Sequence, residues 1–219
     1  SVDSAVPVSI ATITTAKQLS ARANHACLIT TAGSVMCWGQ GGFGQLGNNS
    51  KTNSNTPAMV ATIGPDNYAA TPAVTKAFQV SVGDTHSCAR VSTSSGSAGL
   101  GGKCWGSTNH GELGDGALFC QANTVCDAKL PNPLPQDVSG LTDAATIAVG
   151  GHHTCAVLTS GSMQCWGQGD GGQLGNGLSE HSSSPQSVSG ILAMTNVSAG
   201  SEVTCASDAG ALKCWGQTV

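Results

Sequence analysis

Ten cysteines carry the chemistry that is easiest to identify from spacing in this chain of 219 residues. Eight of them fall into four pairs: Cys27 and Cys37, Cys88 and Cys104, Cys155 and Cys165, and Cys205 and Cys214. Facing residues of neighbouring antiparallel strands lie close enough for a disulfide, whereas the Cys-x2-Cys spacing of zinc sites is absent from the sequence. We predict one disulfide in each pair and a fifth between Cys120 and Cys126, and hence a secreted or cell-surface protein in an oxidising compartment.

Six histidines are the next residues with the chemistry of a ligand or a base. Three of them stand two residues before the first cysteine of a pair: His25, His86 and His153. We predict that each imidazole bonds the backbone of a neighbouring repeat, because a catalytic base is needed only once and requires a nearby reacting group. The others, which lack helical metal spacing and a carboxylate pair, are His110, His152 and His181. No catalytic residue, no metal and no cofactor is therefore expected.

The elements that position these residues repeat along the chain. Each cysteine pair ends in the tripeptide Cys-Trp-Gly, which contains every tryptophan of the protein: Trp38, Trp105, Trp166 and Trp215. Three copies continue into Gly-Gln-Leu-Gly or Gly-Glu-Leu-Gly, with a leucine between two glycines: Leu46, Leu113 and Leu174. Two glycines suit a loop that takes positive φ twice and sends one apolar side chain inward. We predict that the tryptophans pack between adjacent sheets and that the leucines plug the core.

A short run of β-branched and small residues precedes each cysteine pair and predicts a strand packed on one face. The runs are residues 8–13, 78–83, 145–150 and 194–200. In the first copy residues 14–24 are polar, so the strand there is either residues 8–13 or a segment nearer Ala16 to Ala23. Each unit then has two hairpin-joined strands that carry the cysteines, preceded by one or two strands and followed by a glycine loop. No helix is expected.

The string His-x-Cys, a turn at residues 31–34, Cys-Trp-Gly-Gln and Gly-Gln-Leu-Gly-Asn resembles the repeat of the regulator-of-chromosome-condensation family, in its bacterial extracellular, cysteine-bearing form. The resemblance covers nearly the whole chain and implies an all-β fold in which each repeat is a four-stranded antiparallel blade of a β-propeller. The family ring normally has seven blades, and four repeats are visible here, which implies a partial or open propeller. We expect one domain over residues 1–219, with repeats at about 7–56, 57–132, 133–184 and 185–219.

Charge limits the class of partner. The formal net charge is −4, from 12 acidic and 8 basic residues, and the basic residues form no cluster. A nucleic acid requires a basic surface that neutralises phosphates, so we expect no nucleic-acid partner, although the eukaryotic namesake works on chromatin. No apolar run approaches the ~20 residues that span a bilayer, so we expect no membrane span.

Segments that differ between copies are where we expect recognition, because a blade does not need them. The candidate contact residues in these insertions are Asn67, Tyr68, Leu118, Phe119 and Asn123. The predicted function is a non-enzymatic extracellular propeller that binds a protein or builds a surface assembly. One alternative is an enzyme inhibitor similar to the bacterial β-lactamase inhibitory propeller. The other is a glycan-binding propeller, with platforms from Tyr68, Phe119 and Phe43.

The number of visible repeats bears on whether the propeller ring can close. Four blades of a seven-bladed family leave two open blade faces with unpaired strand edges. We therefore expect either a piece of a longer chain or faces that are covered by further copies of the chain, in a homo-oligomer or a filament.

Overall fold

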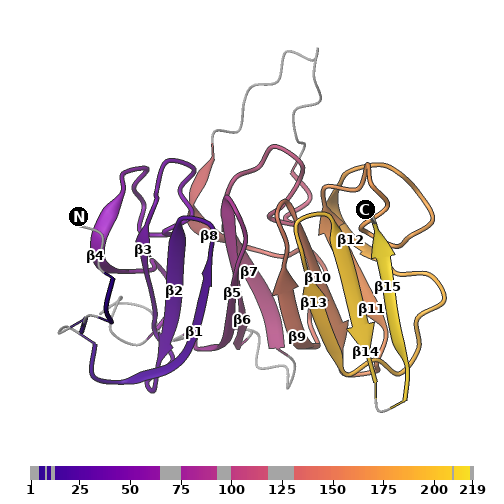
Figure 1. Ribbon diagram of the computed structural model, residues 1–219, viewed down its shortest axis with the longest axis horizontal. Helices are drawn as coiled ribbons and strands as arrows, with labels where there is room; N and C mark the ends of the chain where they lie inside the picture. Colours follow the sequence, from indigo (N-terminus) through magenta and orange to yellow (C-terminus); the bar gives the residue numbers. More distant parts are fainter. Residues whose placement is uncertain are drawn as a thin grey trace.

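The computed structural model describes residues 5–7, 9–10, 13–64, 75–92, 100–117, 131–208 and 210–217. These residues form four antiparallel sheets that stand side by side in chain order (Figure 1). The first sheet consists of β1 (Ala16–Arg22), β2 (His25–Thr30), β3 (Val35–Gly39) and β4 (Ser54–Met59). The second consists of β5 (Ala77–Val82), β6 (His86–Ser92), β7 (Leu100–Gly106) and β8 (Asn132–Asp137). The third consists of β9 (Ala144–Val149), β10 (His153–Leu158), β11 (Met163–Gly167) and β12 (Ser182–Ser187). The fourth consists of β13 (Asn196–Ala199), β14 (Val203–Ser207) and β15 (Leu212–Gly216).

The first three sheets have the strand order of a propeller blade: an inner strand, two cysteine-bearing strands and an outer strand. One strand precedes each hairpin, and the outer strands β4, β8 and β12 follow the glycine loops. Each outer strand contains proline, which suits a sheet edge because proline has no N–H to donate. The repeat limits given above stay a prediction, and the sheets themselves run over residues 16–59, 77–137, 144–187 and 196–216. Within the described ranges no helix is long and apolar enough to cross a membrane.

The cysteine-bearing strands form hairpins, as the motif spacing predicts. Their registers place the paired cysteines opposite each other: Cys27 and Cys37, Cys88 and Cys104, Cys155 and Cys165, Cys205 and Cys214. The predicted strands at residues 78–83, 145–150 and 194–200 correspond to β5, β9 and β13. Alternating apolar residues therefore locate these inner strands to within two residues at either end.

The inner strand of the first sheet corrects one prediction. Residues 9, 10 and 13 lie outside any strand, and β1 occupies the alternative segment. This strand is polar because its side chains cover a backbone edge: Gln18 Oε1 accepts from Val80 N at 2.8 Å, and Gln18 Nε2 donates to Val80 O at 3.1 Å. Gln79 of β5 makes the same two bonds with Ile147 of β9. Polar inner-strand residues thus satisfy the open edge of the next inner strand.

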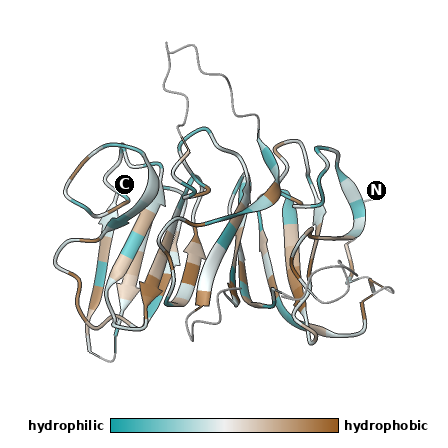
Figure 2. Cartoon of the chain, turned by 180° about the vertical axis from the view of Figure 1, so that it is seen from behind, coloured by the Kyte–Doolittle hydropathy of each residue, from teal (hydrophilic) through white to brown (hydrophobic). Residues whose placement is uncertain are grey.

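The apolar core lies between the sheets. β2 contacts β5, β6 contacts β9 and β10 contacts β13, so each hairpin packs on the inner strand of the following sheet. Three buried clusters fill these junctions, and each draws residues from two neighbouring sheets. In Figure 2 the most hydrophobic segments lie mainly in the strands. The repeat is therefore stabilised by its neighbours as much as by its own hydrogen bonds.

Two faces are defined by the connections at the strand ends. The loop face holds the inner-strand turns at residues 23–24, 83–85, 150–152 and 200–202, with the glycine loops at 40–53, 107–117 and 168–181. The turn face, at the opposite ends of the strands, holds the hairpin turns at 31–34 and 159–162 and the connections between sheets. The glycine loops extend upward in Figure 1.

Candidate functional site

Four disulfides link the two central strands of the four sheets: Cys27–Cys37, Cys88–Cys104, Cys155–Cys165 and Cys205–Cys214. The predicted partners Cys120 and Cys126 lie outside the described residues. Disulfides in this number persist where thiols are not kept reduced, so the four bridges indicate an oxidising environment.

A recurring contact joins each glycine loop to the sheet that follows it. The indole N–H of a tryptophan donates to a loop carbonyl: Trp105 to Gln45 at 2.8 Å, Trp166 to Glu112 at 3.0 Å and Trp215 to Gln173 at 3.0 Å. The leucine of the same loop lies in or against the cluster that receives this tryptophan: Leu46 with Trp105, Leu113 with Trp166 and Leu174 with Trp215. We call this contact the indole latch.

Burial of the tryptophans follows from their place in the row of sheets. Trp105 and Trp166 are fully buried, since each lies between two sheets. Trp38 and Trp215, in the first and the fourth sheet, are only half-buried. The leucines Leu46, Leu113 and Leu174 are all buried.

The second glycine of each loop makes the indole latch fit. Gly114 has a φ of +67°, and a Cβ atom added there would lie 2.7 Å from Trp166 Nε1. Gly47 and Gly175 have the same conformation and would clash with Trp105 and Trp215 in the same way. Any side chain at these positions would displace the indole, so the motif needs glycine for both its backbone angle and its lack of a side chain.

The recurring histidines make a second contact between sheets, and here the prediction needs a correction. Each imidazole Nε2 lies 2.8 or 2.9 Å from a hydroxyl of the next sheet, not from its backbone: His25 from Ser87, His86 from Thr154 and His153 from Thr204. The hydroxyls of Ser87 and Thr204 donate in turn to the loop carbonyls of Gln45 and Gln173. Because a hydroxyl has one proton to donate, the imidazole must be the donor to it. The hydroxyl therefore satisfies a ring nitrogen and a carbonyl at once.

Burial keeps these three imidazoles neutral. It lowers the pKa of His25 and His153 from 6.5 to about 4 and that of His86 to about 3. The sequence Asp84-Thr85-His86-Ser87 has the residue types of a catalytic triad but does not form one, because Ser87 bonds His25 of the first sheet. Among the described residues the recurring histidines are thus structural groups.

One glycine loop differs from the other two. Glu112 takes the place that Gln45 and Gln173 have in the other copies, and its carboxylate is fully buried. It accepts hydrogen bonds from Ser107 Oγ at 3.0 Å, from His110 N at 2.8 Å and from His110 Nδ1 at 3.2 Å. His152 Nδ1, from the turn between β9 and β10, lies 3.7 Å from Glu112 Oε1. We call Ser107, His110, Glu112 and His152 the Glu112 cluster.

The Glu112 cluster is an electrostatic unit. Burial alone would raise the pKa of Glu112, but the interactions of its carboxylate with His110 and His152 hold that pKa well below its usual range. The bond with Glu112 raises the pKa of His152. Sequence reasoning treated His110 and His152 as unrelated loop residues. The available signal was the single acidic residue at a position where the other loops have glutamine.

The side chain of Arg22 joins three sheets beside this cluster, through one salt bridge and hydrogen bonds. Arg22 Nε donates to Asp84 Oδ1 at 2.7 Å, and Arg22 Nη2 donates to Ser201 Oγ at 2.9 Å. Arg22 ends β1, whereas Asp84 and Ser201 lie in the inner-strand turns of the second and fourth sheets. The loop face therefore brings charged groups of several repeats together.

The candidate contact residues predicted for partner binding, Asn67, Tyr68, Leu118, Phe119 and Asn123, lie outside the described residues. Residues 118–130 follow Ala117 of the second glycine loop, so this insertion leaves the loop face close in sequence to Glu112. Phe43, in the first glycine loop, is half-buried.

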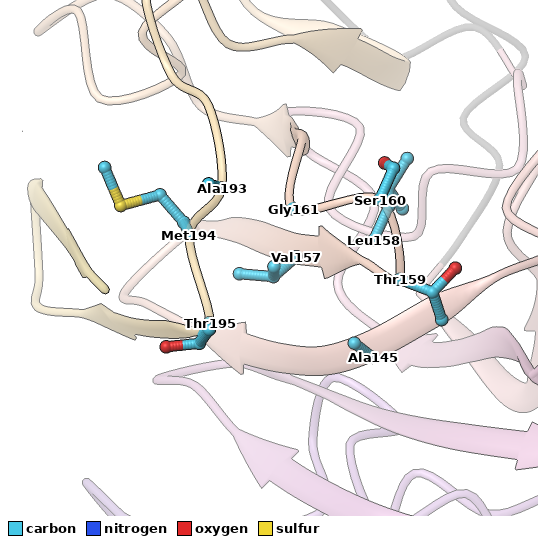
Figure 3. Close-up of a pocket in the computed structure, with 9 residues that line it drawn as sticks. All are labelled: Ala145, Val157, Leu158, Thr159, Ser160, Gly161, Ala193, Met194 and Thr195. Carbon is cyan, nitrogen blue, oxygen red and sulfur yellow. The ribbon is translucent and has the colours of Figure 1, made fainter. Parts of the chain in front are cut away.

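A pocket lies on the turn face between the third and fourth sheets. Residues of β10, the turn at 159–162 and the connection before β13 line this open pocket of about 310 Å³ (Figure 3). Val157 and Met194 supply apolar surface, and Thr159, Ser160 and Thr195 supply hydroxyls. None of the lining side chains titrates near neutral pH, so the pocket offers contacts but no acid–base chemistry.

The sequence is similar to family models and to known proteins that contain the same repeat. A model of the regulator of chromosome condensation (RCC1) repeat matches residues 32–90, 104–157 and 160–207, and a second model of that repeat matches residues 16–45 and 144–173. The chain is 29% identical to the ultraviolet-B receptor UVR8 of Arabidopsis thaliana, over 90% of this chain and 40% of that protein. It is 31% identical to the human E3 ubiquitin-protein ligase HERC2, over 75% of this chain and 3% of that protein. The chain thus spans less than half the length of these relatives.

Solved structures show the same architecture. Human WBSCR16 superposes with a TM-score of 0.70 at 21% identity, over 92% of this chain and 47% of that chain. Prp20p of Saccharomyces cerevisiae superposes with a TM-score of 0.67 at 19% identity, over 93% of this chain and 44% of that chain. At these identities the likeness shows the propeller fold alone.

Proposed function

Because this chain belongs to the regulator of chromosome condensation (RCC1) repeat family, we propose that it is a non-enzymatic propeller module that binds a protein partner outside the cell or at its surface. One observation carries this proposal: three of the recurring tryptophans, the three recurring leucines and the three recurring histidines are engaged in contacts between sheets. Recognition is left to residues that do not recur, and the longest run of these, residues 118–130, follows the second glycine loop in the sequence.

Relatives of the same fold support a protein partner. Prp20p has binding properties to Gsp1p and histones, and Kap60 binds yeast RCC1 (Prp20). We expect no nucleic-acid partner for the present chain, since the net charge is −4 and the four disulfides indicate an oxidising environment. A secreted or surface-exposed protein fits both conditions.

The second glycine loop is the place where we expect this partner. The insertion at residues 118–130 leaves this loop, and its sequence has the apolar pair Leu118 and Phe119. Exposed loops on a rigid scaffold are the usual sites of recognition, since they vary without cost to the core. The Arg22–Asp84 salt bridge adds a charged rim on the same face.

Deletion of residues 118–127 tests the proposal. The disulfide-intact chain, fixed to a support, is expected to retain a protein from the extracellular fraction of its source, and the deletion variant is expected to lose it. The melting temperature should stay the same, because the deleted segment follows the last residue of the second glycine loop that bonds within it. The matched control changes Thr159 and Ser160 to alanine on the turn face and should retain the partner.

The outcome separates the alternatives. Unchanged retention by the deletion variant would move the site to the recurring loops and contradict the proposal. Binding to a glycan array in place of a protein would favour the glycan-binding propeller. A retained partner that is an enzyme, and that loses activity when bound, would identify an inhibitor.

A further inference from the structure

The buried carboxylate of Glu112 and the two imidazoles beside it form a set of possible metal ligands, which the other copies of the repeat do not have. We propose that His110, Glu112 and His152 bind a divalent cation, with Zn²⁺ as the best fit, across the junction of the second and third sheets. This inference goes beyond the proposed function and does not depend on it. Imidazole and carboxylate are ordinary ligands of zinc, and three protein ligands leave a fourth position for water.

The geometry of the three ligand atoms suits a small tetrahedral cation. Two ligands at about 2.05 Å from zinc in a tetrahedral site lie about 3.3 Å from each other. Glu112 Oε1 lies 3.2 Å from His110 Nδ1 and 3.7 Å from His152 Nδ1. All three ligand atoms lie within 4.8 Å of one another. A small rotation of either imidazole brings the third pair to the distance that a cation needs.

The three glycine loops differ in one side-chain atom of the residue at the position of Glu112. In all three loops one side-chain oxygen accepts from the backbone N–H two residues earlier: Gln45 Oε1 from Phe43, Glu112 Oε2 from His110 and Gln173 Oε1 from Gly171. The remaining atom is Nε2 in Gln45 and Gln173, and it is buried without a hydrogen-bond partner among the described residues. In the second copy the remaining atom is Glu112 Oε1, which faces both imidazoles. The backbone bond holds the loop in every copy, and the second oxygen is the ligand.

Neighbouring groups define the rest of the site. His181 Nδ1 accepts from Gly169 N at 3.1 Å, so the other nitrogen of its neutral ring carries the proton and cannot be a ligand. The His181 ring lies edge-on to His110, with 4.9 Å between the ring centroids, and supplies no ligand atom. Thr85 Oγ1 lies 3.3 Å from His152 Nδ1, and this contact gives way when the nitrogen binds a cation.

The bound cation would join two sheets and remain reachable from water. His110 and Glu112 belong to the loop after β7, whereas His152 belongs to the turn before β10. The side chains of His110 and His152 are 28% and 35% exposed, so a hydrated cation has a way in, while the buried carboxylate fixes its position. In the metal-free cluster His110 Nδ1 donates its proton to the hydrogen bond with Glu112, so binding of the cation requires the tautomer with the proton on Nε2. Each imidazole then binds through Nδ1 as a neutral ring, and no oxidant or reductant is needed.

Zinc binding by the disulfide-intact chain tests the proposal. After dialysis against Zn²⁺ and removal of loosely held metal, the wild type is expected to retain one zinc ion per chain. Glu112→Gln installs the residue of the other two loops and therefore should fold, yet it should weaken zinc binding by more than about tenfold, because even changes outside the ligand set cost about 10- to 100-fold. His152→Asn, which gives this turn the residue of the first copy, Asn24, should weaken binding equally.

A matched histidine provides the control. In the first copy Asn53 Oδ1 accepts from Gly41 N as His181 accepts from Gly169 N, so His181→Asn keeps that bond and removes a histidine that is not in the proposed ligand set. This variant should bind zinc like the wild type. Cobalt in place of zinc should give the intense visible absorption of a tetrahedral site in the wild type and in His181→Asn, but not in Glu112→Gln. Equal zinc retention by the wild type and Glu112→Gln, or an equal loss in His181→Asn, would overturn the proposal.

Discussion

At the scale of single residues, the recurring polar groups of the repeat are used for contacts between neighbouring sheets. The carbonyl of Gln45 accepts from the Trp105 indole and from the Ser87 hydroxyl, and the same hydroxyl accepts from His25. Buried polar groups are costly when they have no partner, so each bond of this small network that is lost should cost stability. The residues that form the network recur in the sequence because the network recurs between the sheets.

The tryptophans should therefore matter in proportion to their burial. Trp105→Ala or Trp166→Ala is expected to lower the free energy of unfolding by about 3 to 5 kcal/mol, since each removes a fully buried ring and its hydrogen bond. Trp38→Ala is the matched control and should cost clearly less, because that ring is half-buried. Urea unfolding followed by circular dichroism measures all three. Equal losses at the three positions would contradict the indole latch.

The buried histidines make the fold sensitive to acid. His25, His86 and His153 have pKa values of about 3 to 4 in the folded chain and 6.5 as the reference, so the unfolded chain binds more protons between pH 6.5 and about 4. Stability is then full above pH 6.5 and falls as the pH drops, by about 1.4 kcal/mol per pH unit for each proton taken up on unfolding. The raised pKa of His152 acts in the opposite direction and offsets part of one proton.

Urea midpoints at pH 7, 6 and 5 check this expectation, with a net uptake of nearly three protons on unfolding near pH 5, where His152 is protonated in both states. His181 is outside the network between sheets, but burial lowers its pKa too, so His181→Asn should remove only its own contribution and keep the pH dependence that His25, His86 and His153 supply. A midpoint that stays constant from pH 7 to pH 5 would show that these imidazoles are not buried as neutral groups.

The Glu112 cluster shows what sequence alone did not reveal at this scale. His110 and Glu112 lie close in sequence, but His152 belongs to another repeat, and only the packing of the second sheet against the third brings it near. Spacing rules for metal sites describe ligands on one element, so they cannot predict a site whose ligands come from two repeats. The recurring contacts, by contrast, were visible because their residues repeat.

At the scale of elements, the hairpin is the unit that the sequence identifies best. Paired cysteines at 10 or 9 residues of separation require a tight turn between facing strands, and the register of β10 and β11 places Cys155 opposite Cys165. The first inner strand was harder to locate. Its residues are selected for hydrogen bonds to β5, and an apolar pattern does not report such bonds.

Each disulfide should contribute measurably to its hairpin. Replacing Cys155 and Cys165 with alanine is expected to lower the free energy of unfolding by about 2.5 to 3 kcal/mol, the entropy of closing a loop of about ten residues. Peptide mapping without reduction should recover the four bridges of the sheets, together with the predicted pair Cys120 and Cys126, and no free thiol. Cross-sheet pairs in the map, or a variant as stable as the wild type, would contradict this assignment.

At the scale of the whole molecule, four sheets in a row leave the first and the fourth with one face that no other described sheet covers. Leu19 of β1 and Leu212 of β15 are 60% and 72% exposed, and Trp38 and Trp215 are half-buried in these same sheets. Apolar surface and open strand edges favour association. The interior junctions, by comparison, are closed.

The 219 residues, produced by themselves, should therefore associate. Light scattering is expected to give a mass above the 21.7 kDa of one chain, and charged residues in place of Leu19 and Leu212 should shift it toward the monomer. Leu178, which is also exposed but lies in the third glycine loop, is the control and should leave the mass unchanged when it is replaced. A stable, non-aggregating monomer of the unaltered chain would show that the outer sheets need no cover.

Hydrogen exchange of the four indole N–H groups tests the central claim, that the recurring residues are used to join one blade to the next. In nuclear magnetic resonance spectra of the disulfide-intact chain, the N–H of Trp105 and of Trp166 should exchange slowest, because each is fully buried and bonded to the preceding loop. Trp215, bonded but half-buried, should be intermediate, and Trp38 should be fastest. Fast exchange of Trp105 and Trp166, at the rate of Trp38, would contradict the account.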